Sequence, residues 1–276
     1  MTLDERALAF QCGGDWLYGV ASLPAAGGRR GVLVVVGGPQ YRAGSHRQFT
    51  LLARDLARDG VPAMRFDYRG MGDSEGAARS FEDIDEDLSA AIDAFIEAAP
   101  GMREVVLWGL CDGASAAAMY APSDHRVSGL VLLNPWVRTT NGLARTTLRH
   151  YYRQRLGERG FWRHLLSGRF DLAGSLRSML GTARAALAPG SPGSALPERM
   201  LAALSSFKGR IMVITAGADL TGSEFCDLAA AKPAWTQLLR APSVTRHKLE
   251  GADHTFSRRD WRDQVSAWTS TWVRSW

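Results

Sequence analysis

The chain has 276 residues, a net charge of +5 and 46% hydrophobic residues. This length suits one large α/β domain or a domain that carries an insertion, and the ordinary apolar fraction excludes a disordered chain. No apolar run approaches the roughly 18 residues of a membrane span, and the N-terminus lacks the apolar stretch of a secretory signal. We therefore expect a cytoplasmic protein without a transmembrane segment.

Strands and helices are predicted to alternate along most of the chain. Apolar, β-branched runs predict strands, and apolar residues at helical spacing predict helices. Strands are expected at residues 16–21, 31–36, 61–66, 104–108, 127–133, 211–216 and 245–249, and helices at residues 48–58, 81–95 and 114–120. This order predicts an α/β fold with a mostly parallel central sheet and helices on both faces, because β-α-β crossovers are right-handed.

Two stripes of side chains have plain structural interpretations. The acidic residues of the second predicted helix are expected to form a solvated face: Glu82, Asp83, Asp85, Glu86 and Asp87. The last segment has large apolar residues at helical spacing, which favours a closing helix buried against the sheet over an aromatic binding stripe: Trp261, Val265, Trp268, Trp272 and Trp276.

Residues 137–205 interrupt the alternation of strands and helices. This segment contains eleven arginines, no lysine and three acidic residues, a net charge of +8, so the rest of the chain carries −3. We interpret it as a helical cap inserted into an α/β core formed by residues 1–136 and 206–276. A solvated arginine-rich face is the plain interpretation of its charge, and attachment to an anionic lipid surface is a second.

The three cysteines have different contexts. Cys12, Cys111 and Cys226 are odd in number and far apart, so we expect neither a disulfide framework nor a zinc site. We expect no metal and no cofactor. By default each thiol is a small buried hydrophobe, and only Cys111 lies in a pattern that indicates chemistry.

Cys111 lies at the centre of a nucleophile-elbow pattern. Residues 109–113 read GLCDG, which is G-x-S-x-G with cysteine in place of serine, between a predicted strand and a predicted helix. The elbow exposes its central side chain, and the positive end of the helix dipole favours a thiolate there. We expect Cys111 to be the nucleophile and Ser115, one helical turn later, to pack in the interior.

A thiol nucleophile needs a base, and the base needs an acid that orients it. The chain order in elbow proteins is nucleophile, acid, histidine. Asp219 follows the strand predicted at residues 211–216, and His254 follows the last predicted strand. We therefore expect Asp219 and His254 to be the acid and the base. We do not expect Asp253 to be the acid, because it is adjacent to His254 and the side chains of sequence neighbours seldom face each other.

A tetrahedral intermediate needs two backbone N–H donors. Asp112, directly after the nucleophile, is expected to supply one. The loop after the strand at residues 31–36 should supply the other, and Pro39 has no N–H. Gly38 or Gln40 is the remaining candidate for the second donor.

The order of these motifs resembles that of the α/β-hydrolase superfamily over nearly the whole chain. Three segments are similar to the type 1 hydrolases associated with the exosortase A system, a bacterial family: GGPQYR with GSHRQF at residues 37–49, RFDYRGMGDSEG at 65–76 and GLCDGAS at 109–115. The resemblance implies a catalytic set of Cys111, Asp219 and His254 and no particular substrate. In the elbow alone, the chain also resembles dienelactone hydrolases and polyhydroxyalkanoate synthases.

A thiol suits thioester substrates, because attack on a thioester exchanges one thioester for another, whereas attack on an oxygen ester gives a more reactive product. We expect a thioesterase or acyltransferase acting on a small-molecule acyl substrate carried by coenzyme A or a carrier protein. Arg149, Arg153 and Arg163 of the cap are the candidate phosphate contacts. The alternatives are an oxygen-ester or lactone hydrolase and a non-enzymatic binding protein on a hydrolase scaffold. No nucleic-acid motif accompanies the basic pI, so no such partner is expected.

Overall fold

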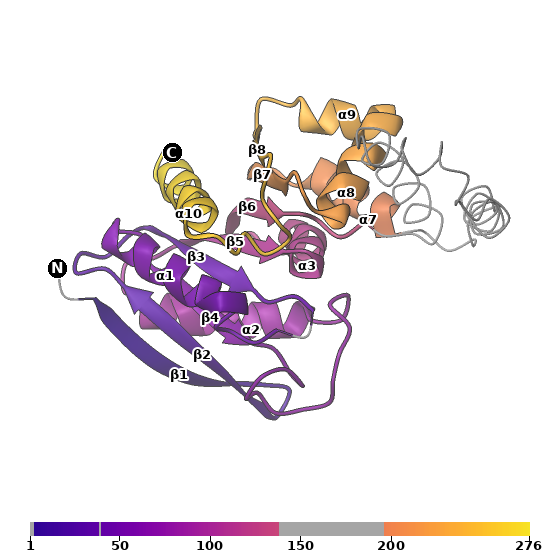
Figure 1. Cartoon of the computed structure of the whole chain (residues 1–276). Coiled ribbons are helices and arrows are strands. Elements are labelled where there is room, and N and C mark those ends of the chain that lie inside the picture. The colour runs from indigo at the N-terminus through magenta and orange to yellow at the C-terminus, as the bar shows by residue number, and fades with distance from the viewer. Residues whose placement is uncertain (1–2, 39, 138–195) are drawn as a thin grey trace, which may run out of the picture.

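The computed structural model describes residues 3–38, 40–137 and 196–276, which form an open eight-stranded sheet with helices on both faces (Figure 1). The strands are β1 (Asp4–Cys12), β2 (Asp15–Leu23), β3 (Arg30–Val35), β4 (Ala63–Asp67), β5 (Glu104–Leu110), β6 (Val127–Leu133), β7 (Arg210–Ala216) and β8 (Val244–Leu249). The α-helices are α1 (Gln48–Arg58), α2 (Asp85–Ala98), α3 (Asp112–Tyr120), α7 (Leu196–Ser206), α8 (Leu220–Ala231), α9 (Pro233–Leu239) and α10 (Arg259–Val273). Two 3-10 turns are η1 (Ser45–Arg47) and η2 (Ala121–Ser123).

The strand order is β1-β2-β4-β3-β5-β6-β7-β8. All neighbours from β4 to β8 pair in parallel, and β1 and β2 add an antiparallel hairpin at one edge. The predicted mostly parallel sheet is confirmed. The sequence analysis did not predict β1, because most of its residues are exposed on an edge strand and it has no apolar run.

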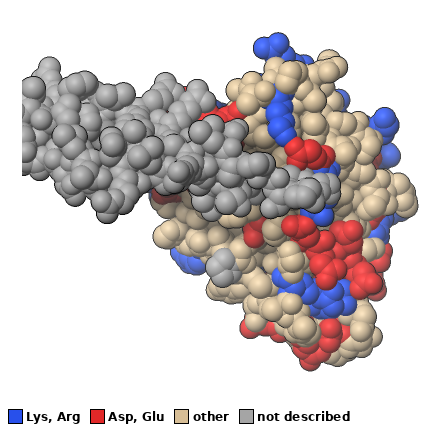
Figure 2. Space-filling view, turned by 90° about the vertical axis from the view of Figure 1, so that its right-hand side faces the viewer, with Lys and Arg blue, Asp and Glu red and all other residues tan. Residues whose placement is uncertain are grey.

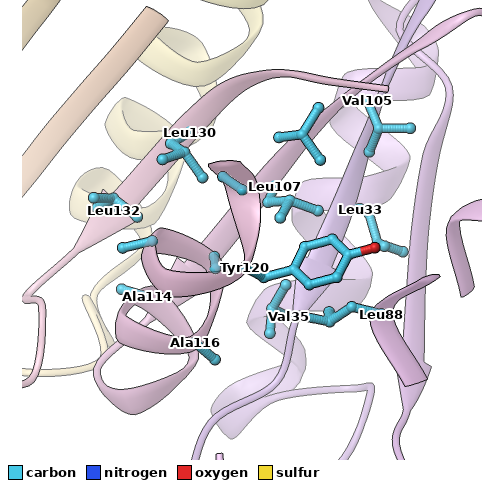
Figure 3. Packing of buried hydrophobic residues seen from close by; sticks show 14 of the residues in the cluster. Leu33, Val35, Leu88, Val105, Leu107, Ala114, Ala116, Tyr120, Leu130 and Leu132 are labelled. Carbon is cyan, nitrogen blue, oxygen red and sulfur yellow. The ribbon is translucent and has the colours of Figure 1, made fainter. Parts of the chain in front are cut away.

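The core lies on both faces of the sheet, because alternate residues of each central strand point to opposite sides. In β5, Val105 and Leu107 face α2 and α3, whereas Val106 and Trp108 face α1 and α10. Figure 3 shows the first cluster, with the Tyr120 ring among the side chains of β3, β5 and β6. Small residues of α3 let this helix lie close to the sheet at the point where the elbow must turn.

The acidic residues 82–87, which lie in the turn before α2 and in its first turn, form only partly a solvated face. Figure 2 shows a face of the molecule on which acidic side chains gather beside basic ones. Glu82 pairs with Arg199, and Glu86 pairs with Arg69 at 2.7 Å. The prediction was wrong for Asp87, whose fully buried carboxylate accepts hydrogen bonds from the Arg69 guanidinium at 2.9 to 3.2 Å. A buried carboxylate is retained only with such a partner.

The closing helix is confirmed as α10, which packs with α1 on one face of the sheet. Val265 and Trp272 are buried, and Trp276 lies beyond the end of the helix with its ring 4.4 Å from that of Trp272. No helix in the described ranges is long and apolar enough to cross a membrane.

The described part of the predicted cap is short. Residues 196–205 lie in α7, which packs on α3 and buries Met200 and Leu204 in the core cluster. Residues 138–195, with Arg149, Arg153 and Arg163, lie outside the described residues.

Candidate active site

Cys111 occupies a strained turn between β5 and α3. Its backbone has φ 61° and ψ −124°, a conformation that residues other than glycine rarely adopt. A Cβ on Gly109 would lie 2.4 Å from the Gly113 carbonyl oxygen, and one on Gly113 would lie 2.5 Å from the Val35 carbonyl oxygen. Only glycine fits at both positions, so the GLCDG pattern forms the strand–turn–helix geometry that it predicts.

Backbone hydrogen bonds hold the elbow at the carboxyl edge of the sheet. The Cys111 N–H donates to the Leu133 carbonyl at 2.9 Å, and the Cys111 carbonyl accepts from Trp136 N–H at 3.1 Å. The Cys111 side chain is half-buried. Ser115 is fully buried and its hydroxyl donates to the Trp136 carbonyl at 2.7 Å, so it packs in the interior as predicted.

The structure brings Asp219 and His254 together beside Cys111. Asp219 caps α8, where its Oδ2 accepts from Gly222 N–H at 2.8 Å and lies 3.0 Å from His254 Nδ1. The Cys111 side chain lies close enough to His254 to raise the pKa of the imidazole. Asp253 turns away and accepts hydrogen bonds from the N–H and hydroxyl of Ser257.

These contacts favour a protonated imidazole. The hydrogen bond to Asp219, and then the interaction with Cys111, outweigh burial and raise the pKa of His254 to about 10. Burial raises the pKa of Asp219, but hydrogen bonds from His254 and Gly222 leave it below its usual value. At neutral pH, the site therefore holds an imidazolium between the Asp219 carboxylate and the Cys111 sulfur.

Asn134 supports the histidine loop, and the sequence analysis missed it. It is fully buried after β6 with φ 41°, and its Nδ2 donates to the His254 carbonyl at 3.0 Å. Its Oδ1 accepts from Ala216 N–H at 2.8 Å, so one amide joins the ends of β6 and β7 to His254. The sequence does contain a signal for this residue: an asparagine directly after a buried strand indicates a tight turn, because Asn is enriched at positive φ.

We expect Asn134→Ala to lower the free energy of unfolding by about 1–3 kcal/mol, because it leaves the buried Ala216 N–H unpaired. It should also lower kcat through the misplaced His254 loop. Asn134→Asp is the matched control, since it keeps the acceptor for Ala216 and removes the donor to His254. Urea unfolding and steady-state kinetics measure the two effects, and an unchanged unfolding midpoint for Asn134→Ala would contradict this role.

One of the donors predicted for the oxyanion, Gly38 N–H, already donates to a carboxylate. Gly38 N–H donates to Asp112 Oδ2 at 2.9 Å, and Gly113 N–H donates to Asp112 Oδ1 at 3.0 Å. Gln40 lies in the same loop, where its Oε1 is buried and has no hydrogen-bond partner among the described residues.

Within the described residues, no group of three or more His, Cys, Asp or Glu side chains is arranged to hold a metal ion. The chemistry that the site can perform with its own residues is nucleophilic attack by a sulfur supported by an imidazole and a carboxylate.

An elbow after β5, an acid after β7 and a histidine after β8 of an open, mostly parallel sheet define the α/β-hydrolase class. Residues 28–165, half of the chain, match the family described as serine aminopeptidase, S33. The chain belongs to this family and is an α/β-hydrolase enzyme. The central residue of its elbow is Cys111.

Solved structures share the fold at low sequence identity. An esterase of Pyrococcus furiosus has a TM-score of 0.67 and 14% identity over 99% of this chain and 92% of that one. The α/β hydrolase GrgF of a Penicillium species has a TM-score of 0.63 and 18% identity over 99% and 98% of the two chains. A dienelactone hydrolase of Anabaena variabilis has a TM-score of 0.62 and 15% identity over 99% and 97%. No curated protein sequence matches the chain.

Proposed function

We propose that this enzyme transfers acyl groups through a covalent acyl-Cys111 intermediate, acting as a thioesterase or an acyltransferase. In this mechanism the Cys111 sulfur attacks the substrate carbonyl carbon, and His254 donates its proton to the leaving group. Asp219 holds His254 in the correct tautomer through Nδ1. Water or another acceptor then attacks the acyl-cysteine and releases the acyl group.

The observation that carries the proposal is the position of the His254 ring. Its Nδ1 lies 3.0 Å from the Asp219 carboxylate, and the ring is close enough to Cys111 for the two side chains to interact electrostatically. The imidazolium that Asp219 favours lies beside the half-buried Cys111 sulfur, and its positive charge would stabilise negative charge that develops on the attacking sulfur. A sulfur nucleophile suits thioester substrates, because the exchange of one thioester for another is nearly even in free energy.

Hydrolysis of oxygen esters or lactones is the second candidate. It is favoured by the fold shared with an esterase and with a dienelactone hydrolase. A comparison of kcat/KM for acetyl- and hexanoyl-coenzyme A with p-nitrophenyl esters of the same acyl chains separates the two. Faster turnover of the thioesters supports the first proposal. Turnover of the oxygen esters alone would contradict it.

The +8 charge of residues 137–205 supports an acyl donor that bears phosphate, such as coenzyme A or a carrier protein. We expect replacement of Arg149, Arg153 and Arg163 with Glu to raise KM for a coenzyme A thioester at least about tenfold, since each site loses an attractive charge and gains a repulsive one. KM for an uncharged p-nitrophenyl ester should stay within about twofold. Equal KM changes for both substrates would contradict a phosphate contact.

The motifs at residues 37–49, 65–76 and 109–115 further support a place near the type 1 hydrolases associated with the exosortase A system. That assignment adds a bacterial setting to the proposal and leaves the acyl group open.

A further inference from the structure

The Asp112 carboxylate lies where the site should bind the charge of its reaction intermediate. It accepts hydrogen bonds from Gly38 N–H at 2.9 Å and from Gly113 N–H at 3.0 Å. The expected donors to the tetrahedral oxyanion are the backbone N–H of Asp112 and that of Gly38 or Gln40. The Gly38 N–H is therefore directed at an anion that belongs to the protein.

The surrounding chain is shaped to hold this carboxylate. A Cβ on Gly37 would lie 2.1 Å from Asp112 Oδ1, so a residue without a side chain is needed beside it. The carboxylate lies at the N-terminus of α3, where the helix dipole favours negative charge. It also lies within electrostatic reach of His254. Two backbone donors, a glycine and a helix start thus surround the Asp112 carboxylate, and burial raises its pKa, so the anion is held at a cost that leaving this position can relieve.

A substrate oxyanion and this carboxylate compete for the Gly38 N–H. Two like charges a few ångströms apart in a partly buried site repel each other strongly. A substrate carbonyl can use Gly38 N–H only after the carboxylate leaves it, for example by rotation toward the His254 imidazolium. The free energy of that displacement must come from contacts with the rest of the substrate.

We propose that the Asp112 side chain is an internal occupant of the oxyanion hole, which an acyl substrate must displace before Cys111 can be acylated. This inference rests on the proposed acyl-cysteine chemistry. It makes Asp112 a specificity-determining residue: small activated esters react slowly because they bring little binding energy, whereas acyl donors with an extended carrier group can displace the carboxylate.

The test is the rate of Cys111 acylation by p-nitrophenyl acetate, followed by release of p-nitrophenol and by intact mass. We expect Asp112→Ala to raise this rate at least about tenfold, since one oxyanion donor is worth about 10²–10³ in rate. Asp112→Asn should give a smaller gain, because its neutral amide oxygen can still accept from Gly38 but brings no charge. Asp260→Asn, an exposed acid on α10, is the matched control and should leave the rate unchanged.

Alkylation of Cys111 by iodoacetamide forms no oxyanion, so it reports thiol reactivity alone. Alkylation rates should stay within about threefold across the variants, and thermal unfolding checks that each variant folds. Slower or equal acylation of both Asp112 variants, with alkylation unchanged, would overturn the inference and show that the carboxylate only fastens the Gly38 loop. An acyl group mapped to a residue other than Cys111 would instead overturn the proposed function.

Discussion

Replacing Cys111 with serine should lower thioester turnover at least about a hundredfold at neutral pH, although the family is named for a serine enzyme. A serine hydroxyl needs a neutral histidine to remove its proton. Asp219, the largest cause of the raised His254 pKa, remains in the variant and keeps the imidazole largely protonated. Cys111→Ala removes the nucleophile altogether and should lower turnover at least about a thousandfold.

Ser115→Ala is the matched control for this series. Ser115 lies one helical turn from Cys111, and its hydroxyl is used in a structural hydrogen bond to the Trp136 carbonyl. We expect the kcat of Ser115→Ala to stay within about threefold of the parent value. A Cys111→Ser variant as active as the parent would show that His254 acts as a neutral base, contrary to the protonated imidazole expected from its raised pKa. Steady-state kinetics on one acyl-coenzyme A substrate decide between these outcomes.

Asp219→Asn should lower kcat about a thousandfold with a much smaller change in KM. The amide cannot stabilise the imidazolium, and it favours the wrong histidine tautomer. The pKa of His254, about 10 in the parent, should fall toward the usual value of about 6.5. The pH profile of the Cys111 alkylation rate should therefore differ between the two proteins at high pH, where His254 loses its proton in the parent but is already neutral in the variant. An unchanged profile would contradict the role of Asp219.

The same pair makes stability depend on pH in a defined direction. The raised His254 pKa contributes stability that is complete below about pH 6.5 and is lost as pH rises through about 10. The lowered Asp219 pKa contributes stability that is present above its unfolded value and is lost in acid. Urea unfolding should therefore find Asp219→Asn more destabilising near pH 5.5 than near pH 9.5. Equal destabilisation at the two pH values would contradict the ion pair.

Much of the sheet and the candidate site could be predicted from the sequence, because their signals are local. Buried parallel strands are continuous apolar runs, and the two glycines around Cys111 indicate the elbow. Asp219 and His254 were found from their positions after the last two strands. Their hydrogen bond follows from a parallel sheet, whose strands all end at the same edge.

The remaining features depend on contacts between distant segments. Nothing near Asp87 indicates a buried ion pair with Arg69, and Asn134 acts through His254, 120 residues later. The Asp112 backbone was assigned as a donor to the oxyanion, but its side chain was not considered. Its hydrogen bond to Gly38 joins residues 74 positions apart, so only the folded chain reveals it.

The most direct test of the account is intact-mass spectrometry of the protein after incubation with acyl-coenzyme A and p-nitrophenyl ester substrates, beside Cys111→Ala. The account predicts a mass increase equal to the acyl group on the parent protein, carried by the peptide that contains Cys111 and absent from the variant. Turnover of these substrates by Cys111→Ala at the parent rate, or an acyl group on another residue, would contradict it.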